Sequence, residues 1–185
     1  MFLEIEAKLK VDSFADVERR LAEGGASFVA KKLQIDYYYD TVDRQLTQTD
    51  RCLRLRRERT TEGEHLILTY KGPKEADDFK KRQEVNLMFS DVEAVECLIE
   101  GLGYRRALVF DKKRSVWNLD DCEVALDELP LIGAFVEIEG PDSERITHVR
   151  EVLDLMTVSH VMESYAALID EALSQRGLEE REVFL

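Results

Sequence analysis

The sequence is poor in the residues that cross-link or interrupt a chain. Among its 185 residues there are 3 cysteines, 3 prolines and 1 tryptophan, and the cysteines stand far apart at Cys52, Cys97 and Cys122. Three widely spaced cysteines build neither a disulfide framework nor a zinc site, and they fit reduced thiols in an intracellular protein. We therefore assign no chemistry to them.

Positive charge is scarce as well. The 26 Lys and Arg residues stand against 39 Asp and Glu, which gives a formal net charge of -13 at pH 7. Such a chain lacks the basic face that nonspecific binding to nucleic acid or anionic lipid requires. No apolar run is long enough to cross a bilayer, and neither a secretory leader nor a lipidation signal is visible. We expect a cytoplasmic protein with no nucleic-acid or membrane partner.

The chain does contain enough apolar sequence for a core. It is 44% hydrophobic and 35% charged, and no linker, repeat or low-complexity segment divides it, so we predict a single domain over residues 1–185. Alternating apolar and polar positions predict strands over residues 2–11, 34–41, 51–59, 65–72, 82–89, 107–119, 122–129 and 134–140. Helical spacing with capping residues predicts helices over residues 12–25, 90–104, 143–156 and 164–175.

The connections between these elements favour an antiparallel sheet. The Glu62-Gly63 pair predicts a hairpin turn, and residues 72–81 read as a polar loop. Helices do not follow every strand, as a parallel sheet would require. The predicted class is therefore antiparallel α+β.

The predicted strands carry their charges on one face. In FLEIEAKLKV, residues 2–11, Glu4, Glu6 and Lys8 fall on one side, while Ile5 and Leu9 fall on the other. Seven strands show this alternation. Together the charged faces hold seven cations and seven anions: Lys8, Arg54, Arg56, Lys71, Arg82, Lys112 and Arg114, with Glu4, Glu6, Glu84, Glu123, Asp127, Glu137 and Glu139.

Two arrangements account for the charged faces. In an open amphipathic sheet they would face bulk water. In a closed barrel of about eight antiparallel strands they would line the interior. We favour the closed eight-stranded antiparallel barrel with helices packed outside, because apolar stripes on several helices could cover the opposite faces.

A charged interior has to hold water, ions or a ligand, since unpaired buried charges are costly. Arg and Lys side chains suit the many oxygens of a phosphate chain. Carboxylates would repel that chain unless they bind a hard divalent cation, such as Mg²⁺ or Mn²⁺, that also touches phosphate. We therefore predict that Glu4 and Glu6 are metal ligands and that Lys8 reaches a phosphate.

Short motifs along nearly the whole chain resemble those of the CYTH family, in the same order. They are ExExK at 4–8, LRLR at 53–56, LTYKGP at 68–73, RQE at 82–84, KKR at 112–114, ALDEL at 125–129, FVEIEG at 135–140 and SYAALI at 164–169. That family comprises class IV adenylyl cyclases, thiamine triphosphatases and inorganic triphosphatases, also called triphosphate tunnel metalloenzymes. The resemblance implies an eight-stranded tunnel that binds a triphosphate and one or two divalent metal ions.

The resemblance also implies a role for each matched position. The ligands of Mg²⁺ or Mn²⁺ would be Glu4, Glu6 and Glu139, helped by Glu137 and Asp127. The triphosphate would be held by Lys8, Arg54, Arg56, Lys71, Arg82, Lys112 and Arg114. The groups nearest the reaction would be Lys8, Arg56, Lys112, Arg114, Asp127 and Glu137. Arg82 and Glu84 could instead form an ion pair that only balances charge, Glu123 would be structural, and Tyr165 would pack the last helix against the tunnel opening.

Two reactions and one binding role are open. In an adenylyl cyclase the ribose 3′-hydroxyl of ATP attacks the α-phosphorus and releases pyrophosphate, giving cyclic AMP. In a triphosphatase, water attacks the terminal phosphorus of inorganic triphosphate, thiamine triphosphate or a nucleoside triphosphate. We favour the cyclase, because LTYKGPK and the loop after it are most similar to that class. A polyphosphate-binding module without turnover is the third alternative, and a homodimer is compatible with the sequence.

Overall fold

Eight antiparallel strands form a closed barrel in the structure, a computed structural model that describes residues 2–75 and 79–185. The barrel strands are β1 (Phe2–Val11), β2 (Ser27–Asp40), β3 (Cys52–Thr60), β4 (Gly63–Lys71), β5 (Lys80–Phe89), β6 (Arg105–Leu119), β7 (Cys122–Leu129) and β8 (Gly133–Glu139). The helices are α1 (Ala15–Glu23), α2 (Gln45–Gln48), α3 (Val92–Gly101), α4 (Ser143–Val152) and α5 (Tyr165–Gln175). A short ninth strand, β9 (Glu182–Val183), pairs in parallel with β6.

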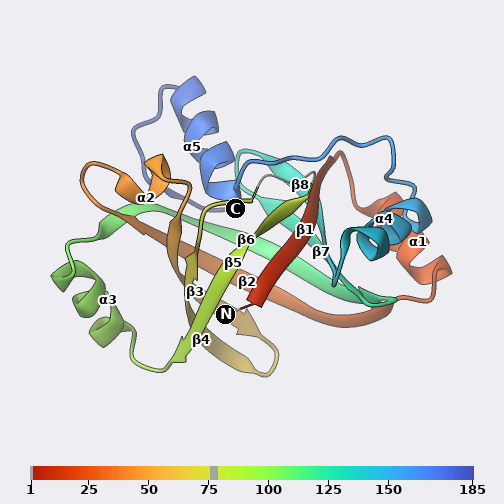
Figure 1. The fold of residues 1–185 in the computed structure, drawn as a ribbon, viewed down its shortest axis with the longest axis horizontal. Helices are drawn as coiled ribbons and strands as arrows, with labels where there is room; N and C mark the ends of the chain where they lie inside the picture. Colours follow the sequence, from red (N-terminus) through yellow and green to blue (C-terminus); the bar gives the residue numbers. More distant parts are fainter. Residues whose placement is uncertain (1, 76–78) are drawn as a thin grey trace.

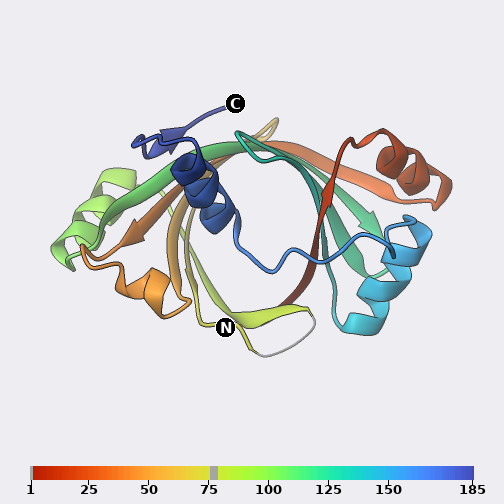
Figure 2. The ribbon, with the colours of Figure 1, turned by 90° about the horizontal axis from the view of Figure 1, so that it is seen from above.

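Long-range pairing closes the barrel (Figures 1 and 2). The strand order is β2-β3-β4-β5-β1-β8-β7-β6, and β6 also pairs with β2. The first strand of the chain therefore lies between β5 and β8, with Glu4 opposite Arg82 and Lys8 opposite Glu137. The predicted α+β class and the closed eight-stranded antiparallel barrel are confirmed.

The first half of β2, the helix α2 and the short strand β9 were not predicted from the sequence. β2 spans 14 residues rather than 34–41, because its first half, SFVAKKL, lacks regular alternation. Pairing with β6 makes this half a strand, across a register shift between Phe28 and Ala30. The helix α2 has only four residues, too few to show a helical period. It is held by Asp40, whose carboxylate accepts hydrogen bonds from the backbone N–H groups of Leu46 and Thr47.

Other boundaries shift by a few residues. β5 begins at Lys80 instead of residue 82, and α4 ends at Val152 instead of residue 156. Thr60 pairs with Gly63, so the β3–β4 turn is formed by residues 61–62 rather than by Glu62-Gly63. Of the predicted loop over residues 72–81, residues 76–78 lie outside the described residues.

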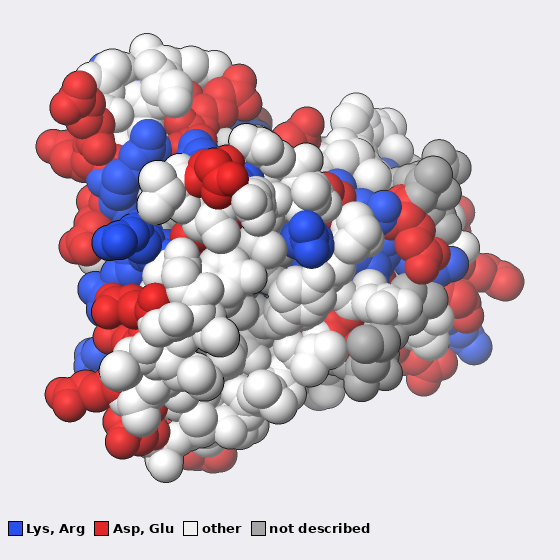
Figure 3. All heavy atoms as spheres, turned by 60° about the vertical axis from the view of Figure 1, so that its left-hand side comes forward, with Lys and Arg blue, Asp and Glu red and all other residues white. Residues whose placement is uncertain are grey.

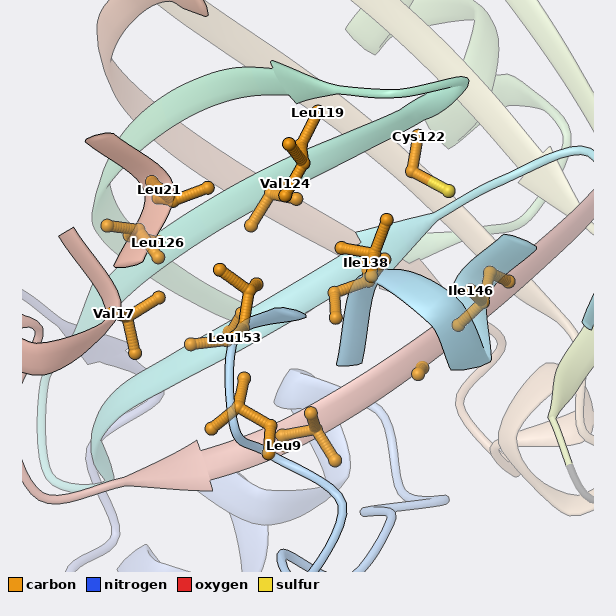
Figure 4. Packing of buried hydrophobic residues seen from close by; sticks show 14 residues of the cluster. Leu9, Val17, Leu21, Leu119, Cys122, Val124, Leu126, Ile138, Ile146 and Leu153 are labelled. Atoms are coloured by element: carbon orange, nitrogen blue, oxygen red, sulfur yellow. The ribbon is translucent and has the colours of Figure 1, made fainter. Parts of the chain in front are cut away.

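The largest buried cluster lies between the barrel wall and two helices. Leu9, Val124 and Ile138, from β1, β7 and β8, pack against Leu21 of α1 and Ile146 of α4 (Figure 4). Because side chains alternate along a strand, burying these residues outside the barrel directs their neighbours into its interior. The helices on this side therefore fix which residues face the tunnel.

The helices α3 and α5 occupy different positions. α3 covers the outside of the barrel, where its Ile99 packs with Tyr39 and Leu55. In α5, Tyr165 packs in one cluster with Phe110, which belongs to the inward-facing set of its strand. α5 therefore lies over one opening of the barrel rather than on its outer wall (Figure 2).

Charge is unevenly distributed over the outer surface. The side of the molecule on which α3 lies shows a broad area without charged side chains (Figure 3). Leu87, Leu98 and Leu102 are each more than half exposed. Within the described part of the chain, no helix has both the length and the apolar character needed to span a membrane.

Replacing Ile138 by alanine tests the packing between barrel and helices. Ile138 is fully buried, and truncating such a side chain costs about 2–5 kcal/mol. We expect the free energy of unfolding, measured with urea, to fall by that amount. Val42→Ala, at a residue that is 81% exposed, is the control and should change it by less than about 0.5 kcal/mol. Equal stability of the two variants would show that this interface is not close-packed.

Candidate active site

The barrel encloses a cavity of about 420 Å³, a volume typical of small-molecule sites. Side chains from all eight barrel strands line it. The predicted charged residues that line it are Glu4, Glu6, Lys8, Arg54, Arg56, Lys71, Arg82, Lys112, Arg114, Glu123, Glu137 and Glu139. The charged faces therefore converge on one enclosed space instead of facing bulk water.

Arg56 is held by a carboxylate that was not among the predicted site residues. Its Nε and Nη2 donate to the two oxygens of Asp36 at 2.6 and 2.7 Å. Arg54 lies beside this pair, with Nη1 3.9 Å from Asp36 Oδ2. Burial alone would raise the pKa of Asp36, but the charges of Arg56 and Arg54 outweigh it and hold that pKa well below its ordinary value. Asp36 thus keeps two guanidinium groups side by side on the wall.

Asp127 gathers three donors behind the cavity wall. Its carboxylate accepts hydrogen bonds from Lys112 Nζ at 3.0 Å, from Arg114 Nε at 2.7 Å and from the Tyr165 hydroxyl at 2.9 Å. Asp127 itself is fully buried and does not line the cavity. Burial, reinforced by the nearby Arg114 charge, lowers the pKa of Lys112 to about 7. In this position Asp127 orients Lys112 and Arg114, and both of its carboxylate oxygens already accept hydrogen bonds.

Lys8 lies against the ring of Tyr165. Its Nζ is 3.8 Å from the ring centroid, and Lys112 Nζ is 4.9 Å from the same point. Both lysines therefore make cation–π contacts with one aromatic ring. Lys8 Nζ also lies 3.4 Å from Glu137 Oε1, and Glu137 in turn accepts a hydrogen bond from Arg114. Tyr165 thus packs α5 against the opening and directly contacts the cationic wall.

Lys71 bridges two carboxylates from neighbouring strands. Its Nζ donates to Glu4 at 2.6 Å and lies 2.5 Å from Glu84, which does not line the cavity. Arg82 Nε is 3.8 Å from Glu4 Oε2, beyond hydrogen-bond distance. In the described residues, the Nε atoms of Arg82 and Arg54 are buried without a hydrogen-bond partner. Such donors cost free energy until an acceptor reaches them.

Three glutamates form a row across neighbouring strands. Glu6 lies opposite Glu139, and Glu139 lies opposite Glu123. Burial raises the pKa of Glu139 to about 7, with further contributions from Glu4, Glu123 and Glu6. Like charges directly opposite each other destabilise a sheet, and a cation among them would remove that cost.

This set of donors fits a hard divalent cation. Mg²⁺ takes oxygen ligands, often one or two carboxylates together with waters and substrate phosphates. Over residues 2–75 and 79–185, no three His, Cys, Asp or Glu side chains already converge as a metal cage. Glu6 and Glu139 are adjacent, with Glu6 Oε1 3.4 Å from Lys80 Nζ, and Glu4 would have to share its carboxylate with Lys71. The interior therefore suits a cation that substrate oxygens help to bind.

The cavity changes character where it reaches the opening beneath α2 and α5. Its lining there includes Leu46, Leu108 and Ala166. Arg44 Nη1 lies 3.4 Å from Asp170 Oδ2 and so joins the α2 loop to α5. An organic group attached to a phosphate chain would find apolar surface in this part of the cavity.

The predicted set missed several charges that are buried in the described part of the chain, among them Asp36 and Lys80. Asp36 alternates with Gln34 and Tyr38 along a strand that was predicted. Lys80 alternates with Arg82, two residues before the predicted start of β5. The period-two signal was present in both cases. Lys80 would have been found by extending the predicted β5 strand by two residues. Asp36 would have been found by asking which acid balances Arg54 and Arg56.

The fold and the site together define a closed β-barrel whose interior is lined by cations and carboxylates. The CYTH domain model matches residues 3–165. The chain belongs to the CYTH domain family.

Three relatives illustrate the match. A protein of Methanocaldococcus jannaschii named "Putative adenylate cyclase MJ0240" is 32% identical over 154 residues, which is 83% of this chain and 85% of that protein. The structure of the PH1819 protein from Pyrococcus horikoshii OT3 has a TM-score of 0.79 at 28% identity, over 91% of this chain and 98% of that one. The Hippeastrum protein HpAC1 has a TM-score of 0.70 at 16% identity, over 96% and 97%, a likeness of fold alone.

Replacing Asp36 by asparagine tests the ion pair that holds Arg56. The change leaves two buried guanidinium groups without their counter-charge, and we expect the free energy of unfolding at pH 7 to fall by about 3–5 kcal/mol. The folded pKa of Asp36 lies below its unfolded value, so its stabilisation is complete above the unfolded pKa and is lost as the pH falls. The difference between wild type and variant, measured by urea unfolding, should shrink below about pH 4. A difference that does not change with pH would contradict the pair.

Proposed function

We propose that this protein is an enzyme that uses Mg²⁺ or Mn²⁺ to react the triphosphate chain of a nucleotide held in the tunnel, with cyclisation of ATP as the favoured reaction. One observation supports this most. A wall of cations and a row of glutamates face the same enclosed cavity, and the cavity continues to an opening whose lining includes the apolar residues Leu46, Leu108 and Ala166.

The cationic wall would bind the phosphate chain. Arg54, Arg56 and Arg114 offer guanidinium groups to phosphate oxygens. One edge of Arg56 already binds Asp36 and one edge of Arg114 binds Asp127, which leaves their other N–H groups for the phosphate. Lys8, Lys71 and Lys112, which line the cavity, add point charges. Charge stabilisation of this kind, arranged before the substrate arrives, is the main means of catalysis in phosphoryl transfer.

The carboxylates divide into two groups in this proposal. Glu6, Glu139 and Glu4 would hold the metal ion. When bound, that ion would polarise phosphate oxygens and offset the charge that develops during the reaction. The family resemblance implied that Asp127 and Glu137 help to bind the metal. In this proposal they would instead orient Lys8, Lys112 and Arg114, because their oxygens already bind these cations.

Cyclisation requires room for a nucleoside beside the phosphate grip. The apolar lining near Leu46, Leu108 and Ala166 would receive the base and ribose, so that the 3′-hydroxyl faces the α-phosphorus. The cationic wall would then hold the leaving pyrophosphate. The name of the Methanocaldococcus jannaschii relative agrees with this reaction.

Hydrolysis of the terminal phosphate is the second candidate. HpAC1, which shares the fold, is described as a "putative adenylyl cyclase" that reveals a dominant triphosphatase activity. Moving the phosphate chain by one unit along the same cationic wall would place a different phosphorus next to the nucleophile. The fold therefore supports both reactions, and the position of the chain would select between them.

Separation of products decides between the reactions. Purified protein is incubated with Mg²⁺ or Mn²⁺ and either ATP or tripolyphosphate, and we expect cyclic AMP and pyrophosphate from ATP. Orthophosphate as the main product of either substrate would instead establish a triphosphatase. Tight binding without any product would contradict both enzymatic proposals and favour a binding module.

Neutralising two glutamates tests the metal assignment. The double variant Glu4→Gln with Glu6→Gln keeps the side-chain size but removes two negative ligands. We expect Mn²⁺ affinity, measured by electron paramagnetic resonance, to fall by more than about tenfold and metal-dependent turnover by about a hundredfold. Glu128→Gln, on the outer side of β7 beside Lys113, is the matched control. Wild-type Mn²⁺ affinity in the double variant would refute the assignment.

A further inference from the structure

The segment between α4 and α5 runs beside the first strand before it reaches the barrel opening (Figures 1 and 2). The backbone N–H of Val161 donates to the carbonyl oxygen of Lys8 at 2.8 Å, and His160 forms an isolated bridge with Leu9. The His160 ring also packs edge-on against Phe79, with centroids 5.0 Å apart. This segment is therefore attached to the strand that carries Lys8.

Two ammonium groups hold the end of the segment. Lys80 Nζ donates to the carbonyl oxygen of Glu163 at 2.8 Å, and Lys8 Nζ donates to the same oxygen at 3.1 Å. The next residue, Ser164, caps α5 by accepting a hydrogen bond from the Ala167 N–H. Tyr165 follows directly. The position of one carbonyl thus sets where the first turn of α5 begins.

Lys80 and Lys8 differ in what else they can bind. Lys8 lines the cavity, so a phosphate in the tunnel would compete with the Glu163 carbonyl for its ammonium group. Lys80 is 3% exposed and does not line the cavity, although its Nζ is 3.4 Å from Glu6 Oε1. When Lys8 turns to a phosphate, Lys80 is the group that continues to hold the carbonyl.

We propose that Lys80 is a positioning residue for the phosphate-binding wall. It fixes the Glu163 carbonyl, and through it keeps the Tyr165 ring against Lys8 and Lys112 and the Tyr165 hydroxyl on Asp127. Lys8 can then exchange the carbonyl for a phosphate without releasing α5. This inference rests on the proposed triphosphate site.

Amide hydrogen exchange in the protein without ligand tests the first half of the proposal. In Lys80→Met, the amides of residues 161–168 should exchange about tenfold faster than in wild type, because a hydrogen bond from a charged donor is lost. Lys80→Arg, which can still donate to the carbonyl, should restore the slow exchange. Lys81→Met is the matched control, since the neighbouring Lys81 faces the outer side, beside Glu75. If Lys80→Met does not fold, Lys80→Leu, which also lacks a donor, replaces it.

Affinity for tripolyphosphate, measured by calorimetry, tests the second half and needs no turnover. We expect it to fall by about tenfold in Lys80→Met, to recover within about threefold in Lys80→Arg and to stay at the wild-type value in Lys81→Met. Weaker affinity with unchanged exchange would mean that Lys80 acts through its charge, on the phosphate or on Glu6, and would overturn the proposal. Faster exchange with unchanged affinity would overturn it as well.

The same measurements separate this proposal from the proposed function. If wild-type protein does not bind tripolyphosphate, the triphosphate site is wrong, and the exchange data alone decide whether Lys80 holds α5. If wild-type protein binds tripolyphosphate and the Lys80 variants behave like wild type in both measurements, only the positioning role is wrong.

Discussion

Burial of opposite charges in one closed space is the constraint on which this structure depends. A cation array strong enough to hold a polyanion cannot be buried alone, because isolated ions lose too much hydration energy. The barrel therefore places acids within the same wall: Asp36 beside Arg56, and Asp127 beside Arg114. The acids neutralise the cations and also fix the direction of each side chain, so the wall is oriented before any ligand arrives.

The fold was predictable from the sequence because alternation is strong in most of the strands. In β1 the charged residues Glu4, Glu6 and Lys8 alternate with apolar ones, and the same alternation holds over residues 53–56 of β3 and 136–139 of β8. The first half of β2 could not be recognised, since its side chains show no alternation and its strand character comes from hydrogen bonds to β6. The four-residue helix α2 depends on Asp40, a contact that spacing along the chain does not reveal.

Which residues face the interior was also predictable, whereas their partners were not. Asp127 and Glu139 both look like candidate metal ligands in the sequence. They differ in the strand beside them: Asp127 lies opposite Arg114, while Glu139 lies between Glu6 and Glu123. These neighbours are set by the register between strands that are distant in sequence. The sequence alone therefore does not distinguish an acid that is paired with a cation from an acid that is not. The strand register of the closed barrel makes that distinction.

The position of β1 has a consequence for how the chain acquires its structure. This strand precedes the other barrel strands in the chain, yet its two partners are β5 and β8, and Glu6 can meet Glu139 only after β8 has been synthesised. Closing so long a loop is slow, because its entropy is lost before the contacts form. Until the last seam is made, the interior side chains remain hydrated. We therefore expect one late and cooperative step of folding. In this step the barrel closes, its interior side chains lose water and their charges pair.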